Sequence, residues 1–348
     1  MTVINTALLS FGMSGKVFHA PFIHLHPGFK LAGSWERSNQ VIRDFYPEAR
    51  SYQSLEEVLA DQSIDLIVVN TPTSTHADYA TKALLSEKHV IVEKAFTTNA
   101  AEAIQLNALA KASGKKLSVY QNRRWDSDFL TVQSILKKKL LGEVREAFIS
   151  FERFNLELSP KLHKEMPGPG TGNLLDLGPH LVDQALVLFG LPQSVLTADI
   201  RSFRPGSRVD DFFDILLSYQ TFSVRLRSGY HFPVPEPGFI IRGSKGSFVK
   251  SRSDVQETQL KNGQTPLSHG YGIEPESAHG SISLEKGSRK SDEYVKSLPG
   301  NYMAYYNAMH HAIVSDSPVP VSGAEGIYVM KVLDAARESH QSKSEVEI

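Results

Sequence analysis

Short apolar runs alternate with amphipathic segments through the first third of the chain. Five runs rich in Val, Ile, Leu and Ala predict strands, at residues 3–10, 29–35, 64–70, 89–94 and 116–122. The segments between them predict a turn and a helix within 11–26 and helices at 54–62, 76–88 and 100–114. Near-continuous apolar strands separated by helices are typical of a parallel sheet covered on both faces. Five such strands in succession favour an open, doubly wound α/β sheet over a barrel.

The pattern changes after residue 122. A helix at 128–143 and a strand at 145–155 lead into a polar, Gly/Pro-rich stretch, and an apolar helix follows at 174–190. Alternating apolar and polar positions then predict strands between 195 and 251, in an antiparallel or mixed sheet. Polar, Gly-rich residues 256–300 predict loops, and two helices, at 302–316 and 326–339, close the chain. We therefore expect two domains, residues 1–122 and an α+β domain at 123–348.

Composition narrows the classes of partner and of chemistry. The 37 basic and 38 acidic residues give a net charge of −1, so no electrostatic argument favours nucleic acid or an anionic membrane. The absence of cysteine excludes disulfides, thiolate catalysis and cysteine zinc sites. The N-terminus lacks a basic stretch before its apolar run, and no apolar stretch is long enough to span a bilayer. We expect a cytoplasmic, soluble protein.

Three polar residues interrupt the apolar helix predicted at 174–190. Asp176, His180 and Asp183 follow one another at spacings of four and three, which would place them on one face of a helix. A carboxylate beside an imidazole can orient the base that takes a proton from a hydroxyl. Pro179 lies inside this segment, and we expect it to kink or start the helix. A metal site is not expected, because no histidine pair has convincing ligand geometry with a carboxylate.

A glycine motif follows the first predicted strand. Ser10, Gly12 and Gly15 occupy the positions of Gly-x-Gly-x-x-Gly, the turn that holds a dinucleotide pyrophosphate at a helix N-terminus. Gly12 would let the backbone approach the phosphates, and Gly15 would let the helix pack closely on the strand. The motif alone is degenerate, but its place at the first strand-to-helix junction supports a cofactor site.

The cofactor is expected to be NAD or NADP. Glu36 falls 21 residues after Gly15, at the end of the second strand, where an acid holds the ribose 2′-hydroxyl of NAD. A carboxylate there would repel a 2′-phosphate, which favours NAD. Arg37 and Ser38 follow at once and could bind such a phosphate, so NADP stays open.

Two more strand ends belong to the same edge of the predicted sheet. Thr71, Pro72 and His76 follow the strand at 64–70, and Glu93 and Lys94 end the strand at 89–94. Ligands bind outside the carboxyl ends of strands in such sheets. A lysine at the end of an apolar strand is partly desolvated, and its pKa is readily tuned. Alternatively, the lysine extends from the rim of the sheet into solvent.

Taken together, these motifs resemble those of the glucose–fructose oxidoreductase/inositol dehydrogenase (Gfo/Idh/MocA) family. The resemblance covers essentially the whole chain and includes (Gly/Ser)-x-Gly-x-x-Gly, Thr-Pro-x-x-x-His, Glu-Lys and Asp-x-x-x-His-x-x-Asp. Residues 120–126 and 238–250 resemble the branch that includes scyllo-inositol dehydrogenases. The resemblance implies a Rossmann domain followed by an α+β domain with a large, mostly antiparallel open sheet. A free face of that sheet would make a homodimer or homotetramer.

The resemblance also implies an NAD(P)-dependent dehydrogenase acting on a carbinol carbon of a sugar or cyclitol. Lys94, Asp176 and His180 would be catalytic: His180 takes the hydroxyl proton, Lys94 orients the hydroxyl and stabilises the alkoxide, and Asp176 positions its neighbours. Arg123 and Asp183 would bind substrate hydroxyls. The residues implied to line the cofactor are Ser10, Gly12, Gly15, Glu36, Arg37, Thr71, Pro72, His76 and Glu93.

One departure from the family pattern concerns the catalytic lysine. The family's Glu-Lys-Pro is Glu93-Lys94-Ala95 here. Because a cis bond costs several kcal/mol without proline, we expect a trans Lys94–Ala95 peptide.

Two alternative functions remain. One is a sensor or regulator that keeps the fold and the cofactor without turnover, although such a protein would need none of the three catalytic residues. The other is a reductase of the biliverdin type, acting on an amine, imine or conjugated bond, which would not need a histidine base.

Overall fold

The computed structural model describes residues 2–36, 40–286 and 289–348. It divides into two compact units. The first comprises Met1–Asn122, Gln256–Tyr271 and Asn301–Ile327, and the second Arg123–Val255, Gly272–Gly300 and Tyr328–Ile348. Two later segments therefore join the first unit, which the sequence pattern, with its one boundary after residue 122, did not indicate.

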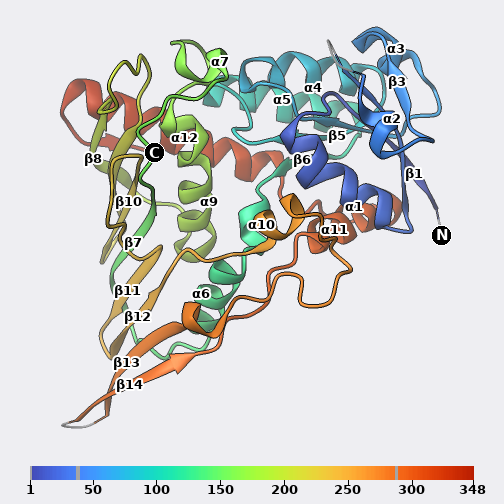
Figure 1. The fold of residues 1–348 in the computed structure, drawn as a ribbon. Coiled ribbons are helices and arrows are strands. Elements are labelled where there is room, and N and C mark those ends of the chain that lie inside the picture. Colours follow the sequence, from blue (N-terminus) through green and yellow to red (C-terminus); the bar gives the residue numbers. More distant parts are fainter. Residues whose placement is uncertain (1, 37–39, 287–288) are drawn as a thin grey trace. The chain divides into compact units, whose positions relative to one another are not determined.

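The first unit is built on a six-stranded parallel sheet, shown in Figure 1, whose order is β3-β2-β1-β4-β5-β6. The strands are β1 (Ile4–Leu8), β2 (Phe29–Trp35), β3 (Arg50–Tyr52), β4 (Leu66–Val69), β5 (His89–Glu93) and β6 (Leu117–Tyr120). Five of them lie where the apolar runs predicted, and the doubly wound sheet is confirmed. The strand order reverses between β1 and β4, so the carboxyl ends of these neighbours form the switch point where such folds bind ligands. The short β3 was missed because its sequence, RSY, carries no apolar run.

The helices of the first unit lie between these strands or in its two later segments. They are η1 (Gly15–His19), α1 (Ala20–Leu25), α2 (Ile42–Phe45), α3 (Leu55–Ala60), η2 (Thr73–Thr75), α4 (His76–Leu85), α5 (Ala100–Ser113), α10 (Gln256–Lys261) and α11 (Met303–Val314). Helix α5 shows why they form where they do. The Asn99 side chain accepts the Glu102 amide at its start, and Gly114, with φ at 65°, ends it. The helix expected after the turn within 11–26 consists of a π-helical segment, η1, followed directly by α1.

The second unit contains a nine-stranded sheet of order β14-β13-β12-β11-β7-β10-β9-β8-β15. Its strands are β7 (Val144–Glu152), β8 (Ser194–Arg201), β9 (Phe212–Ser218), β10 (Ser223–Gly229), β11 (Phe239–Gly243), β12 (Gly246–Lys250), β13 (Gly280–Lys286), β14 (Arg289–Val295) and β15 (Val346–Glu347). Only β7 and β10 pair in parallel, which confirms a large, mostly antiparallel sheet.

The prediction of loops over 256–300 was wrong. This stretch contains α10, the one-turn η4 (Glu276–Ala278), and the orange hairpin of β13 and β14 in Figure 1. Polar residues dominate both strands of the hairpin: β13 has only two alternating apolar residues, Ile282 and Leu284, and β14 has no alternation. Backbone pairing of β13 with β12 makes them strands, and that pairing is not visible in local sequence.

Helices of the second unit include η3 (Asn122–Trp125, beginning in the first unit), α6 (Ser127–Lys137), α7 (Leu162–Glu165), α8 (Asn173–Asp176), α9 (Gly178–Phe189) and α12 (Gly323–Ser342, also beginning in the first unit). Helix α9 packs on β7 and β10. Ile149, Val224 and Leu226 on these strands are fully buried, as alternation predicts for the covered face. No helix in the described part of the chain is long and apolar enough to cross a membrane.

Candidate active site

The turn after β1 has the glycine geometry that a dinucleotide site needs. A Cβ added at Gly12 would meet only the Ser10 hydroxyl, at 3.5 Å, so the exposed backbone there is open to a ligand. A Cβ at Gly15 would lie 2.5 Å from the Ser10 carbonyl oxygen, so only glycine fits. Ser10 replaces the motif's first glycine and uses its hydroxyl to accept the Gly12 amide at 3.2 Å. The residues present therefore fit a bound pyrophosphate.

Asn70 braces this turn, and the sequence reasoning missed it. Its Nδ2 donates to the Ser10 carbonyl oxygen at 2.8 Å, which ties the end of β4 to the glycine turn. The signal was available, because Asn70 directly follows the apolar run of β4 at the edge where ligands bind.

Glu36 is buried and bonded to its own chain. One carboxylate oxygen accepts the Val41 amide at 3.0 Å, and the other accepts the Ile42 amide at 3.1 Å. Glu36 thus caps the start of α2, a role that carboxylates fill well at helix N-termini. Arg37 and Ser38 lie outside the described residues.

His76 joins two strand ends. Its ring is 1% exposed, with Nδ1 2.7 Å from the Ala95 carbonyl oxygen and Nε2 2.9 Å from that of Thr71. Burial lowers the pKa of His76. Pro72 precedes η2 in extended conformation, and the Thr71 hydroxyl lies 2.7 Å from that of Thr75. Both ring nitrogens of His76 therefore contact backbone, so the ring holds Thr71 and Ala95 in place.

The peptide bond between Lys94 and Ala95 is cis, so the prediction of a trans bond was wrong. That prediction weighed only the intrinsic preference of a bond that lacks proline. It ignored the buried surroundings, where Ala95 and Phe96 are each 1% exposed and the Ala95 carbonyl contacts His76.

The Glu93 carboxylate links Lys94 to the glycine turn. It accepts the Lys94 amide at 3.1 Å and the Ser14 hydroxyl at 2.6 Å, and it lies 3.0 Å from Nε2 of His19. Burial raises the pKa of Glu93, but hydrogen bonds and charge from His19, with smaller contributions from Ser14 and Lys94, outweigh it and hold the pKa below its usual value. Glu93 is therefore a largely buried carboxylate, and no local pattern along the chain indicates its pairing with His19.

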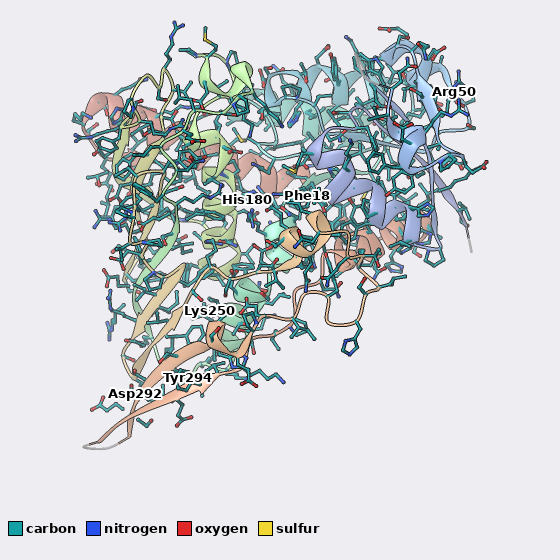
Figure 2. All side chains as sticks on the ribbon, in the orientation of Figure 1. Phe18, Arg50, His180, Lys250, Asp292 and Tyr294 are labelled. Carbon is teal, nitrogen blue, oxygen red and sulfur yellow. The ribbon has the colours of Figure 1, made fainter. Side chains whose placement is uncertain are left out.

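The residues Asp176, His180 and Asp183 do not belong to one helix. Asp176 ends α8, and α9 begins at Gly178 with Pro179 in its first turn, so the expectation that Pro179 starts a helix is confirmed. Proline has no amide hydrogen to continue the α8 ladder, which is why the single predicted helix is two. His180, labelled in Figure 2 on the green helix α9, is 4% exposed.

The two carboxylates have different environments. Asp176 has a side chain 39% exposed and lies 3.8 Å from Nζ of Lys164. Burial, and after it the charge of Asp176, raises the pKa of Tyr230 to about 12. Asp183 is buried and accepts two hydrogen bonds from Arg124. The sequence reasoning missed both Arg124 and Tyr230.

Arg123 pairs with Asp126 at 3.1 Å, and its guanidinium lies 4.9 Å from the centre of the Phe151 ring. Asp126 is fully buried, so this pair fixes the start of the segment that carries Arg124. Among residues 2–36, 40–286 and 289–348, no three His, Asp or Glu side chains gather as a metal would require.

Two models of known protein families match the chain. Residues 4–121 match the model of an oxidoreductase family with an NAD-binding Rossmann fold, and residues 135–348 match the model of the C-terminal alpha/beta domain of the same family. The two matches together span most of the chain.

Individual proteins resemble the chain along its full length. It is 38% identical to the uncharacterized oxidoreductase YdgJ of Escherichia coli, over 98% of this chain and 97% of that protein. It is 34% identical to scyllo-inositol 2-dehydrogenase (NADP(+)) IolW of Bacillus subtilis, over 98% of this chain and 94% of that one. A crystal structure of an oxidoreductase from Bacillus cereus superposes with a TM-score of 0.90 at 29% identity, covering 100% of this chain and 99% of that one.

Proposed function

Because the chain belongs to the Gfo/Idh/MocA family of NAD(P)-binding oxidoreductases, we propose that it moves a hydride between nicotinamide and a carbinol carbon of a polyhydroxylated substrate, a cyclitol or a sugar. The observation that carries the proposal is the buried imidazole of His180 at the start of α9, in a chain similar along its length to an inositol dehydrogenase. An imidazole held in place by its surroundings can take the proton from a substrate hydroxyl.

In the proposed reaction a proton leaves the hydroxyl oxygen and a hydride leaves the carbon that bears it. In the oxidative direction His180 would take the hydroxyl proton as the carbon–oxygen double bond forms, and a bound nicotinamide would supply the acceptor for the hydride from the same carbon. Lys94 would hold the oxygen and stabilise its developing negative charge.

Three further side chains would complete the site. Asp176 would orient its neighbours, and Asp183 and Arg123 would bind the remaining hydroxyls of the substrate. Residues Ser10, Gly12, Gly15, Thr71, Pro72, His76 and Glu93 would shape the cofactor site, with His76 and Glu93 acting through the backbone and side-chain contacts described above.

We further propose NADP(H) as the preferred cofactor. The argument for NAD depended on a Glu36 carboxylate directed at a ribose, and both its oxygens accept backbone amides. The name of the similar Bacillus subtilis enzyme specifies NADP(+). Arg37 and Ser38 supply the donors that a 2′-phosphate needs.

The outer face of the second sheet is the proposed contact of a homodimer or homotetramer. Burial alternates along β9, with every second residue partly exposed, so one face of this strand is not covered by the second unit's helices. Size-exclusion chromatography with light scattering tests this, and a monomer at micromolar concentration would contradict it.

The function is tested in two steps. The first step is a fluorescence titration with NADH and NADPH. If neither nucleotide binds, the proposed cofactor site is contradicted. An absorbance screen at 340 nm with NAD or NADP then covers inositols, aldoses and, as non-carbinol controls, imines and biliverdin. Turnover of a cyclitol or sugar supports the proposal. Cofactor binding without turnover across the panel favours a sensor, and turnover of only the controls favours the reductase alternative.

A further inference from the structure

The carbonyl oxygen of Phe18 receives two tyrosine hydroxyls. Phe18, labelled in Figure 2 on the blue helical segment after β1, has its carbonyl oxygen 2.7 Å from the Tyr306 hydroxyl and 2.8 Å from the Tyr120 hydroxyl. Burial raises the pKa of both tyrosines, so both keep their protons. A carbonyl has no proton to give, so each hydroxyl donates its only proton to it.

That count fixes the proton positions on His19. Nδ1 of His19 lies 2.8 Å from the Tyr306 hydroxyl oxygen, whose proton is directed at Phe18. If Tyr306 donated to Nδ1 instead, its oxygen would face the Phe18 carbonyl at 2.7 Å with no proton between two sets of lone pairs. Nδ1 must therefore carry a proton and donate it to Tyr306.

The other ring nitrogen of His19 faces an anion. Nε2 lies 3.0 Å from Oε1 of Glu93, an oxygen that can only accept while the carboxyl is ionised. The His19 side chain is fully buried and that of Glu93 is 12% exposed, so water does not substitute for either contact. With both nitrogens donating, His19 is an imidazolium in a buried ion pair.

We propose that His19 is held doubly protonated by Tyr306 and Glu93, and that it positions the site by fixing the Glu93 carboxylate. That carboxylate reaches the Ser14 hydroxyl beside the glycine turn through Oε1 and the Lys94 amide through Oε2. One buried cation thus orients a carboxylate that contacts both the cofactor turn and the backbone of the lysine. The role of Lys94 rests on the proposed function, whereas the state of His19 and its effect on cofactor binding do not.

The residue that completes the pair comes from the distant end of the chain. Tyr306 belongs to α11, which joins the first unit through segment Asn301–Ile327, and its ring stacks on Phe22 of α1 at 5.2 Å between centres. The His19 ring also packs on the Tyr120 ring at 4.5 Å. The groups that face His19 are therefore Glu93 from β5, Tyr120 from β6 and Tyr306 from α11.

The protonation state is tested on the unaltered protein. With ¹⁵N-labelled histidine, the His19 resonances are assigned by their loss in His19→Gln. At pH 7, and with or without NADPH, both ring nitrogens should show the shifts of an imidazolium. A neutral tautomer, with one nitrogen unprotonated, would overturn the proposal without bearing on whether the chain is a dehydrogenase.

The positioning role is tested with a matched pair of variants on α11. Tyr306→Phe removes the acceptor of His19 Nδ1 and keeps the ring, whereas Tyr305→Phe removes a neighbouring hydroxyl that bonds Ser118 at 2.9 Å. Loss of a hydrogen bond to a charged group predicts an NADPH dissociation constant raised about tenfold in Tyr306→Phe. Turnover should fall with it, and the His19 signal should become neutral. Tyr305→Phe should stay within about twofold on binding.

Equal NADPH affinity in the two folded variants would overturn the positioning role. If Tyr306→Phe does not fold, His19→Gln replaces it, since the amide can donate to Glu93 without a charge. Its affinity should fall in the same way, and wild-type affinity in that variant would also count against the proposal. Because neither binding nor NMR needs a substrate, failure of the dehydrogenase screen would leave these results interpretable.

Discussion

Arg124 donates two hydrogen bonds to the Asp183 carboxylate, from Nε at 2.8 Å and from Nη2 at 2.6 Å. The side chains are 13% and 3% exposed, so this two-point contact is largely shielded from water. It holds η3, where the chain enters the second unit, against α9, the helix that carries His180. The contact therefore positions Asp183, a residue that we propose binds substrate.

Arg124→Lys should lower both stability and turnover, because lysine keeps the charge but cannot form the planar, two-point contact. We expect the free energy of unfolding to fall by roughly 1–3 kcal/mol in urea titrations, since one buried acceptor loses its partner. Arg145→Lys, in an exposed pair with Glu143, is the control and should change it by less than about 0.5 kcal/mol. Equal unfolding midpoints for the two variants would contradict the structural role of Arg124.

Alanine at the two glycines should separate binding from folding. The Cβ of Gly12→Ala would make only an ordinary contact with the Ser10 hydroxyl, at 3.5 Å, so the melting temperature should stay near that of the wild type while NADPH affinity falls at least tenfold. Gly15→Ala places a Cβ 2.5 Å from a carbonyl oxygen, and it should lower the free energy of unfolding by about 1–3 kcal/mol. Thermal melts and fluorescence titrations measure both quantities. Undiminished NADPH binding by Gly12→Ala would place the phosphates elsewhere.

Glu36→Gln should not change the choice between the two cofactors. The glutamine can accept one of the two backbone amides, so the start of α2 is weakened, but no ribose contact is lost. The ratio of NADH to NADPH dissociation constants should stay within about threefold of the wild-type ratio, by parallel titrations. A selective loss of NADH binding, tenfold or more, would instead assign Glu36 to the ribose of NAD.

Acid should destabilise the first unit partly through His89. Burial, assisted by Lys115, lowers the pKa of His89 to about 4, and its Nδ1 accepts the Lys116 amide at 3.0 Å. The histidine of the unfolded state has a pKa of 6.5. Between pH 6.5 and pH 4 the folded state therefore binds fewer protons than the unfolded state. The resulting stability is complete above pH 6.5 and is lost as the pH falls toward 4.

The His89→Asn variant tests this directly, because an asparagine oxygen can accept the Lys116 amide without titrating. Its free energy of unfolding should fall less steeply than that of the wild type between pH 7 and pH 4.5. His311→Asn, at an exposed position on α11, is the control and should keep the wild-type slope. Identical slopes for the wild type and His89→Asn would remove His89 from the acid response.

His180→Asn and Lys94→Ala should each reduce turnover at least about 100-fold, because each removes a proposed proton-transfer or charge-stabilising group. NADPH affinity should change by less than about threefold in His180→Asn, which lies outside the dinucleotide-binding sheet. Lys82→Ala, which removes an exposed ion pair with Asp78 on α4, is the control and should retain most activity. Near-normal turnover in either of the first two variants would exclude that residue from the chemistry.

The sequence anticipated the first unit well because its strands are buried on both faces. The centres of runs such as 64–70 and 89–94 are apolar at consecutive positions, which predicts strands buried on both faces. The glycines at 12 and 15 are recognisable because the local geometry of the strand-to-helix turn needs them. It failed where pairing with a distant segment decides structure. The polar hairpin of β13 and β14, and the three-residue β3, become strands only because a neighbouring strand offers its backbone.

The amino-acid sequence by itself determined the family, the two kinds of sheet and the glycine turn, because periodicity and motif spacing are local properties of the chain. Tertiary structure decided how the polar groups are used. Glu36, expected at a ribose, caps α2, and Asp183, which we propose binds substrate, is positioned by Arg124. Glu93 is held by His19, which depends on Tyr306 almost 290 positions away. Hydrogen bonds are directional and short, so their partners are chosen only when the chain has folded.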